Sequence, residues 1–580
     1  MRLINLNSLI YLIIVTVIFS TNAISEETID IWKNKKKENI ATTTVEKQNN
    51  KKDLFSNAIN SDQNNNLIKI DEEKTKKFEE AKLYGLYDPD ENNFNLEMWQ
   101  QTDATEFKKI MKRINKLNLS STAESILVNT LFSNSFAPKN ISEEEFVNIK
   151  VNWLINNNKE KLIENFLEKN QNFFNKKKLI QHLVDSNISS ANLQDGCKKI
   201  NFISKEIKDP YLEKFKIYCL IFTDKKGEAN LLYDILKEQG KSDKFFDDKI
   251  SYLLGISDKN DGKIKEDTLL NFYISSVTVK DFKYEPNKNT KEIIWKYLNS
   301  ANLIKIDNVE DKQKIKELEI AANENRLKKE KIFEIYQSFS FDLQTLLNAE
   351  RIYVNYENTE SRALIYQKYL LSDNIENQIE YLLLLKDLFK KDNLSNLYRD
   401  FLSNKLKEYD QRDIPKNLAK VVKKNIITEK KVNQGKIKYD DKILHRSKVL
   451  KFYLDKNHTP EKTQKDFNNV YKKIKRNKNY FFSAKDLALV ESLSIDGISI
   501  PKEIKTDQIS KKYSIPQNLL GLIDNKNTGF LVLKIVEIIG EDEVNNLDSE
   551  TIYFITSLLN RSGLKKFRNK IITSALPLRA

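Results

Sequence analysis

The sequence predicts an all-α fold of stacked helical hairpins, similar to a tetratricopeptide-like α-solenoid. The 580 residues include only 12 Gly and 9 Pro, whereas these two residues make up roughly 12% of an average protein. Tight turns are therefore scarce, which argues against sandwiches, barrels and Rossmann-like folds. Apolar residues recur at three- and four-residue spacing, as in amphipathic helices, and no series of strands with period-two alternation is found.

The first 23 residues have the pattern of a secretory signal peptide. Arg2 gives a basic start, an apolar run covers 9–19, and Thr21 and Ala23 are small residues at positions −3 and −1. The apolar run is shorter than the roughly 20 residues that cross a bilayer. We therefore expect cleavage after Ala23 and a periplasmic mature chain without a transmembrane span.

Residues 24–80 are predicted to be a disordered polar arm. They are rich in Asn, Lys, Gln and Glu, with a run of one Gln and three Asn at 63–66. Such a composition buries too little apolar surface to offset the chain entropy lost on folding. The ordered body is expected to begin near residue 81.

Residues 81–414 are predicted to form the helical-hairpin solenoid, and its clearest unit lies between 190 and 255. A first helix is expected to reach about Ile207. Asp209 and Pro210 then form a helix start, because Asp caps the free N–H groups and Pro suits the first helical position. After a turn near 224–227, Ala229 opens the apolar face of the next helix, and Gly240 is placed to end it. The glycine and proline typical of a tetratricopeptide repeat are missing, so the prediction stops at helical hairpins.

A change in composition predicts a basic hinge or linker at 415–438 and a separate C-terminal helical domain at 439–580. Within this domain Ser483 precedes Asp486 by three residues, which predicts a capped helix start. The linker contains eight lysines and a single acidic residue, Glu429. Six of these lysines are candidates for anion binding: Lys416, Lys420, Lys423, Lys424, Lys430 and Lys431.

The formal net charge of +14 raises the question of nucleic acid binding. An exported protein rarely meets nucleic acid, so we expect none as a partner. A basic surface outside the cytoplasm fits anionic lipid, a cell-wall polymer or an acidic protein. Most of these lysines are expected simply to keep the helix surfaces soluble.

The two cysteines, Cys197 and Cys219, lie on the apolar faces of two predicted antiparallel helices. They flank Asp209 at similar separations along the chain, so they are expected at similar heights on neighbouring helices. An even number of cysteines in an exported chain favours a disulfide. Two buried free thiols, or a metal or redox role, are the alternatives.

No catalytic, metal-binding or cofactor-binding residue is predicted, and the chain is not expected to be an enzyme. Its only histidines, His182, His445 and His458, are far apart in sequence and have no metal-ligand spacing. The sequence also lacks the residues that phosphate-binding loops, calcium loops and nucleophile elbows require at their key positions. The catalytic Glu of lytic transglycosylases, with its Gly-Leu-Met-Gln stretch, is missing as well.

Several motifs resemble an uncharacterised family of secreted alphaproteobacterial proteins. They are LYDP at 86–89 followed by MWQQTD at 98–103, DPY at 209–211, and YFFSAKD at 480–486. The resemblance covers most of the chain after residue 80. Members of this family are sometimes labelled "antifreeze glycopeptide polyprotein"-like, but this chain has no Thr-Ala-rich repeat. The resemblance implies an exported helical protein without an established activity, and it assigns no catalytic residue.

Together these features predict an exported helical scaffold or binding module that acts in the assembly or maintenance of the bacterial cell envelope. Solenoids offer long surfaces to extended partners. The expected partner is another envelope protein, with a cell-wall polymer or anionic lipid as further options. One alternative function is a cell-wall hydrolase with an unrecognised carboxylate site, and another is a peripheral module that binds anionic lipid through its basic segments.

Overall fold

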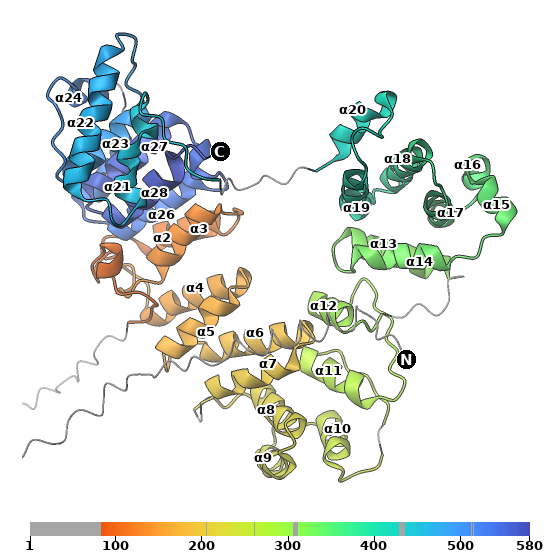
Figure 1. The fold of residues 1–580 in the computed structure, drawn as a ribbon. Coiled ribbons are helices and arrows are strands. Elements are labelled where there is room, and N and C mark those ends of the chain that lie inside the picture. The colour runs from red at the N-terminus through yellow and green to blue at the C-terminus, as the bar shows by residue number, and fades with distance from the viewer. Residues whose placement is uncertain are drawn as a thin grey trace, which may run out of the picture. The chain divides into compact units, whose positions relative to one another are not determined.

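The computed structural model describes residues 83–204, 206–259, 261–304, 311–427, 435–511, 513 and 515–579. The predicted signal peptide at 1–23 and the predicted polar arm at 24–80 lie outside the described residues. The described residues belong to one compact unit and contain 27 α-helices (Figure 1). Within these ranges, β-structure is limited to three isolated bridges. The prediction of an all-α fold is confirmed.

The helices follow one another with short connections. The first group comprises η1 (Asp90–Asn92), α2 (Ala104–Ile114), α3 (Ser121–Leu131), α4 (Glu143–Asn156), α5 (Glu160–Lys169), α6 (Lys176–Ser189), α7 (Leu193–Lys198), η2 (Lys199–Phe202), α8 (Pro210–Phe222), α9 (Lys226–Glu238) and α10 (Lys244–Leu254). The second comprises α11 (Leu269–Thr278), α12 (Glu292–Ser300), α13 (Lys312–Asn323), α14 (Lys329–Ser338), α15 (Leu343–Leu347), α16 (Ala349–Ile352), η3 (Tyr353–Asn355), α17 (Asn358–Leu370), α18 (Ile375–Lys391), α19 (Ser395–Glu408) and α20 (Lys416–Asn425). The third comprises η4 (Leu444–Arg446), η5 (Lys448–Leu450), α21 (Lys451–Leu454), α22 (Pro460–Arg476), α23 (Ala484–Ile495), α24 (Thr506–Ser510), α25 (Gln517–Asp524), α26 (Thr528–Ile539), η6 (Val544–Asn546), α27 (Ser549–Arg561) and α28 (Lys565–Ala575).

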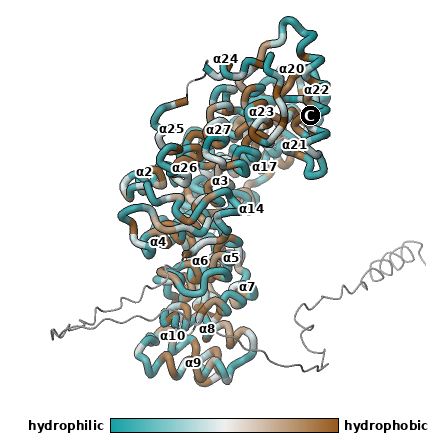
Figure 2. Tube along the Cα trace, turned by 90° about the vertical axis from the view of Figure 1, so that its left-hand side faces the viewer, coloured by the Kyte–Doolittle hydropathy of each residue, from teal (hydrophilic) through white to brown (hydrophobic). Residues whose placement is uncertain are grey.

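Neighbouring helices pack as hairpins, and the predicted pair is α8 with α9. The Asp209 carboxylate accepts hydrogen bonds from the first N–H groups of α8, and Pro210 is its first residue. Gly240 follows α9 with a φ of +67°, a left-handed conformation that glycine adopts without steric cost. Hydrophobic and hydrophilic residues are interspersed along the helices, as amphipathic packing requires (Figure 2).

The expected helix reaching Ile207 is wrong. The chain forms the six-residue α7 and then the short η2, which ends at Phe202. The Asn192 side chain caps the start of α7, so this is a separate helix from α6. A Cβ atom added to Gly196 would lie 3.1 Å from the Asn187 side chain. The bare backbone of α7 thus packs closely against α6, and tertiary packing overrides the continuous apolar pattern.

The first helices of the described chain pack against the C-terminal helices. α2 and α3 both contact α26 (Figure 1). The Gly529 N–H donates to the Met98 carbonyl oxygen over 3.1 Å, and the Trp99 ring covers Gly529 so closely that an added Cβ would lie 2.6 Å from it. The buried Thr102 hydroxyl donates to Asn527 over 2.5 Å. Residues that the sequence assigns to the 81–414 unit are therefore packed onto the 439–580 segment.

The predicted basic linker at 415–438 begins with a helix. α20 covers Lys416–Asn425, and its Val422 is buried while Leu418 packs partly against the core. A helix forms here in place of the expected linker because α20 has apolar residues at i, i+4 spacing. Packing this apolar face against α19 stabilises the helix. Residues 428–434 lie outside the described residues. The placement of the domain boundary stays a prediction.

Candidate functional site

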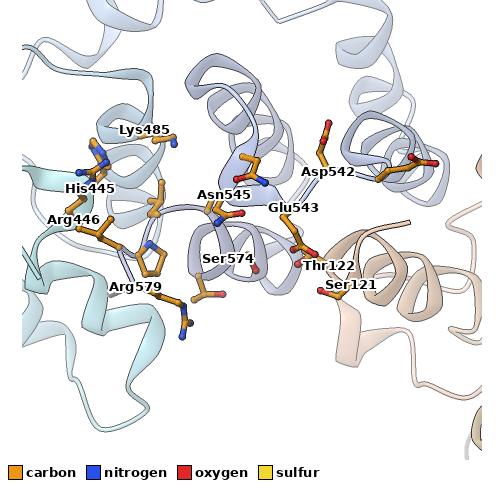
Figure 3. Close-up of a pocket in the computed structure, with 17 residues that line it drawn as sticks. Ser121, Thr122, His445, Arg446, Lys485, Asp542, Glu543, Asn545, Ser574 and Arg579 are labelled. Carbon is orange, nitrogen blue, oxygen red and sulfur yellow. The ribbon is translucent and has the colours of Figure 1, made fainter. Parts of the chain in front are cut away.

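A polar cleft of about 970 Å³ lies among the C-terminal helices, and we call it the C-terminal cleft. Its lining comes from the start of α3, the η4 turn, the start of α23, the loop between α26 and η6, and the end of α28 with the tail that follows it. Figure 3 shows His445, Arg446 and Arg579 on one side and Thr122 and Glu543 on the opposite side. The volume is typical of pockets that hold a small molecule or a short segment of chain.

His445 is held in place on one wall of the cleft. Its backbone N–H donates to Asp486 Oδ1 over 2.9 Å, and its ring Nδ1 lies 2.7 Å from the same oxygen. The neighbouring Leu444 N–H donates to the Tyr480 hydroxyl over 3.0 Å. These bonds fix both the backbone and the ring of His445, so the imidazole enters the cleft with a defined orientation.

Asp486 is a buried carboxylate with an unusual number of donors. It closes the capping box of α23 with Ser483, as the sequence predicts, and also accepts from Tyr480 and His445. Burial by itself raises the pKa of Asp486, but the hydrogen bonds from His445 and Ser483 outweigh burial and lower it. The 2.7 Å contact with this carboxylate favours the tautomer with the proton on His445 Nδ1, and Nε2 is the ring nitrogen that Asp486 does not engage.

The arrangement of Ser483, His445 and Asp486 is not a nucleophilic relay. Ser483 Oγ lies 3.4 Å from His445 Nδ1, the same ring nitrogen that contacts Asp486. In a Ser-His-Asp relay the hydroxyl and the carboxylate engage opposite ring nitrogens. Ser483 therefore acts as a helix cap.

Three further basic side chains share this wall: Arg446, Lys485 and Arg579. Among the described residues, no carboxylate oxygen lies within 4.0 Å of their charged nitrogens. Burial lowers the pKa of Lys485 and the charge of Arg446 lowers it further, whereas the charge of Asp548 acts in the opposite direction. Lys485 is also the second residue of α23, where the helix dipole disfavours a cation. The wall is thus a cluster of basic side chains without an ion pair to a described carboxylate, and the nearby charge of Asp548 offsets only part of the effect of Arg446 and burial on Lys485.

The opposite wall carries Glu541, Asp542 and Glu543. Glu541 accepts a hydrogen bond from the Asn118 N–H over 2.9 Å, which ties the loop to the segment before α3. No ion pair with a described Lys, Arg or His joins any of these three carboxylates. The C-terminal cleft therefore has a basic wall and an acidic wall that do not pair with each other.

The sequence-predicted site residues lie elsewhere. Cys197 and Cys219 form a disulfide between α7 and α8, with 5.4 Å between their Cα atoms, so the bridge is present and the free-thiol alternative is not. Lys416, Lys420, Lys423 and Lys424 are exposed on α20, whereas Lys430 and Lys431 lie outside the described residues. None of the described residues among them lines the C-terminal cleft.

Sequence reasoning treated His445 as isolated and Asp486 as a helix cap. The contact between them joins residues 41 positions apart in the chain. The one local signal was Lys485, a cation in the first turn of a predicted helix, which is an electrostatically poor position. Nothing in the sequence indicated that Arg579, next to the end of the chain, would join the same wall.

No family model, curated protein or solved structure matches the chain. Among the described residues, no group of three or more His, Cys, Asp or Glu side chains is arranged to hold a metal ion. The described helices also include none with the length and apolarity needed to cross a membrane.

Proposed function

We propose that this chain is an exported helical binding module of the bacterial cell envelope, without catalytic activity, and that the C-terminal cleft receives its partner. The observation that carries the proposal is the pair of oppositely charged walls. Side chains that could neutralise one another inside the protein usually do so, and groups left unpaired around a concave surface favour a bound partner.

Three further features support the envelope setting. The first 23 residues have the pattern of a signal peptide. The Cys197–Cys219 disulfide suits an oxidising compartment. Stacked helical hairpins typically serve as scaffolds for other molecules. N-terminal sequencing of protein from the periplasmic fraction should begin at Ile24, and a retained Met1 would contradict export.

Site-specific photo-crosslinking tests binding at the cleft. A benzophenone amino acid at Asn545, an exposed cleft residue, should give a covalent adduct in cells that export the protein. The same amino acid at Glu228, exposed on α9 and outside the cleft, serves as the control. An adduct at Asn545 alone supports the proposal. Absence of any adduct at Asn545, or equal adducts at both positions, would argue against the cleft as the binding site.

A cell-wall hydrolase is the second candidate, and one observation favours it. His445 lines the cleft and its Nδ1 is held by the Asp486 carboxylate, which is an arrangement that suits a general base. Purified protein should be incubated with isolated peptidoglycan and the soluble products analysed by mass spectrometry. We expect no release of muropeptides. Release that disappears in a His445→Gln variant would replace the binding proposal with the hydrolase.

A further inference from the structure

The ligand of the C-terminal cleft can be narrowed by its chemistry, an inference that rests on the proposed function. The basic wall brings together Arg446, Lys485 and Arg579 beside His445. None of these three cations forms an ion pair with a described carboxylate, although the charge of Asp548 acts on Lys485. Gathering like charges in a partly enclosed space costs free energy unless an anion offsets it. The first expected ligand group is therefore an anion.

The acidic wall limits what kind of anion can enter. Glu541, Asp542 and Glu543 line the same cleft, so a polyanion that fills it would meet three carboxylates as well as the basic groups. Like charges placed together oppose binding. Nucleic acid, phosphate-rich polymers and a membrane of anionic lipid are thus poor fits. A ligand that carries both signs of charge, in opposite parts, matches the two walls.

The floor of the cleft is uncharged and polar. Asn545 and Ser574 lie between the two charged walls (Figure 3), and Asn546 also lines the cleft. Amide and hydroxyl groups can both donate and accept hydrogen bonds, which suits the alternating N–H and C=O groups of a peptide backbone. The end of α28 also faces the cleft with Ala575 and Leu576, and the free carbonyl groups of a helix C-terminus favour a cation.

We infer that the C-terminal cleft binds a short peptide segment of dipolar charge, with a carboxylate held by Arg446, Lys485 and Arg579 and a basic group toward Asp542 and Glu543. His445 lies on the same side of the cleft as Arg446 and Arg579 (Figure 3). Arginine and lysine suit a carboxylate because charge-assisted hydrogen bonds to it are short and strong.

The test compares two peptides by isothermal titration calorimetry with the mature full-length protein. Both are N-acetylated six-residue peptides that begin with two lysines and end in alanine, and they differ only in a free or an amidated C-terminus. The free acid should bind at least about tenfold more tightly, because the amide lacks the charge-assisted hydrogen bonds. Raising the salt concentration should weaken binding of the free acid, since part of the cleft is open to solvent.

A double variant, Arg446→Gln with Lys485→Gln, should reduce the affinity for the free acid to that of the amide. The matched control, Lys420→Gln with Lys423→Gln, removes the same charge from the exposed surface of α20 and should leave the affinity unchanged. Unaltered circular dichroism of both variants shows that they are folded. Vesicles of phosphatidylcholine with phosphatidylglycerol should not compete with the peptide.

Three results would overturn the inference: equal binding of the acid and the amide, binding that the control variant weakens as much as the cleft variant, or no measurable binding of either peptide. Competition by anionic vesicles that the cleft variant abolishes would point to lipid instead. The crosslinking experiment at Asn545 tests the proposed function separately, because it requires no knowledge of the ligand. An adduct there without peptide binding would retain the binding module and reject the dipolar peptide.

Discussion

Removing Glu319 should strongly destabilise the helices from α13 to α19. The Glu319 carboxylate and the Arg362 guanidinium form an ion pair of 2.6 Å, with side-chain exposures of 0% and 1%. Tyr336 donates to Glu319 Oε1, and the Thr359 hydroxyl donates to Oε2 over 3.1 Å. Asp392, partly exposed, pairs with the other side of Arg362. One carboxylate thus satisfies three buried donors from two other helices.

The size of the effect follows from these contacts. Breaking a buried ion pair by removing one partner costs about 3–5 kcal/mol, because the remaining charge is left uncompensated. Asp392 continues to pair with Arg362, so Glu319→Leu should lower the free energy of unfolding by about 3 kcal/mol, near the lower end of that range. The double variant Glu319→Leu with Arg362→Met removes both charges, and it should cost less than Glu319→Leu alone.

Urea unfolding followed by circular dichroism measures these changes, and hydrogen exchange in α13 and α17 locates them. The control is Asp410→Asn, which breaks the exposed pair between Asp410 and Arg412 and should leave the free energy of unfolding nearly unchanged, because solvent screens such a pair. The reasoning would be refuted if Glu319→Leu cost no more than this control. It would also be refuted if the double variant were less stable than the single variant.

Three further predictions concern stability. Replacing both Cys197 and Cys219 by Ser should lower the free energy of unfolding by about 3 kcal/mol, since the bridge closes a loop with a sequence separation of 22; calorimetry of both forms, with peptide mapping of the bridge, checks this. Burial raises the pKa of Asp185 to about 6 from an ordinary value of 3.8, so the folded state holds this proton more tightly and stability should fall as the pH rises through this interval. Asp185→Asn should remove this pH dependence, and in urea unfolding at pH 7.5 it should raise the free energy of unfolding by about 1–2 kcal/mol. An equal stabilisation at pH 4 would contradict the raised pKa of Asp185. Gly529→Ala would place a methyl group 2.6 Å from an indole ring and should cost about 1–3 kcal/mol in thermal unfolding, whereas Gly521→Ala, which meets nothing within 4 Å, should be neutral or stabilising.

The local features of the fold were predictable because their causes are local. A carboxylate at Asp209 and a proline after it start α8, and Gly240 ends the following hairpin. The capping box of α23 needs only Ser483 and Asp486, three positions apart. The failed helix toward Ile207 had an adequate apolar pattern. Its interruption depends on α6 and α8 lying against α7, which no window of sequence contains.

The candidate site was not predictable, because each of its parts is ordinary in isolation. Asp486 has a complete local role as a cap, and its second role appears only when the η4 turn brings His445 beside it. Arg579 joins the basic wall because the chain segment at 437–438 pairs with the tail, where the Lys438 N–H donates to the Leu578 carbonyl oxygen over 2.8 Å. The chain contains many charged residues that could come together in a cluster. Only the tertiary structure determines which of them do.

The position of the acidic wall depends on contacts between the two ends of the described chain. The Ser120 N–H donates to the Gly540 carbonyl oxygen over 3.0 Å, and the Asn118 N–H donates to the Glu541 side chain. Both bonds join residues more than 400 positions apart, and both hold the loop that carries Asp542 and Glu543. The loop that carries Asp542 and Glu543 thus rests on the packing of α2 and α3 against α26, whereas Lys485 lies on α23, which packs against α27. A ligand that bridges the walls would stabilise this packing, because anything that binds only the folded arrangement adds to its stability.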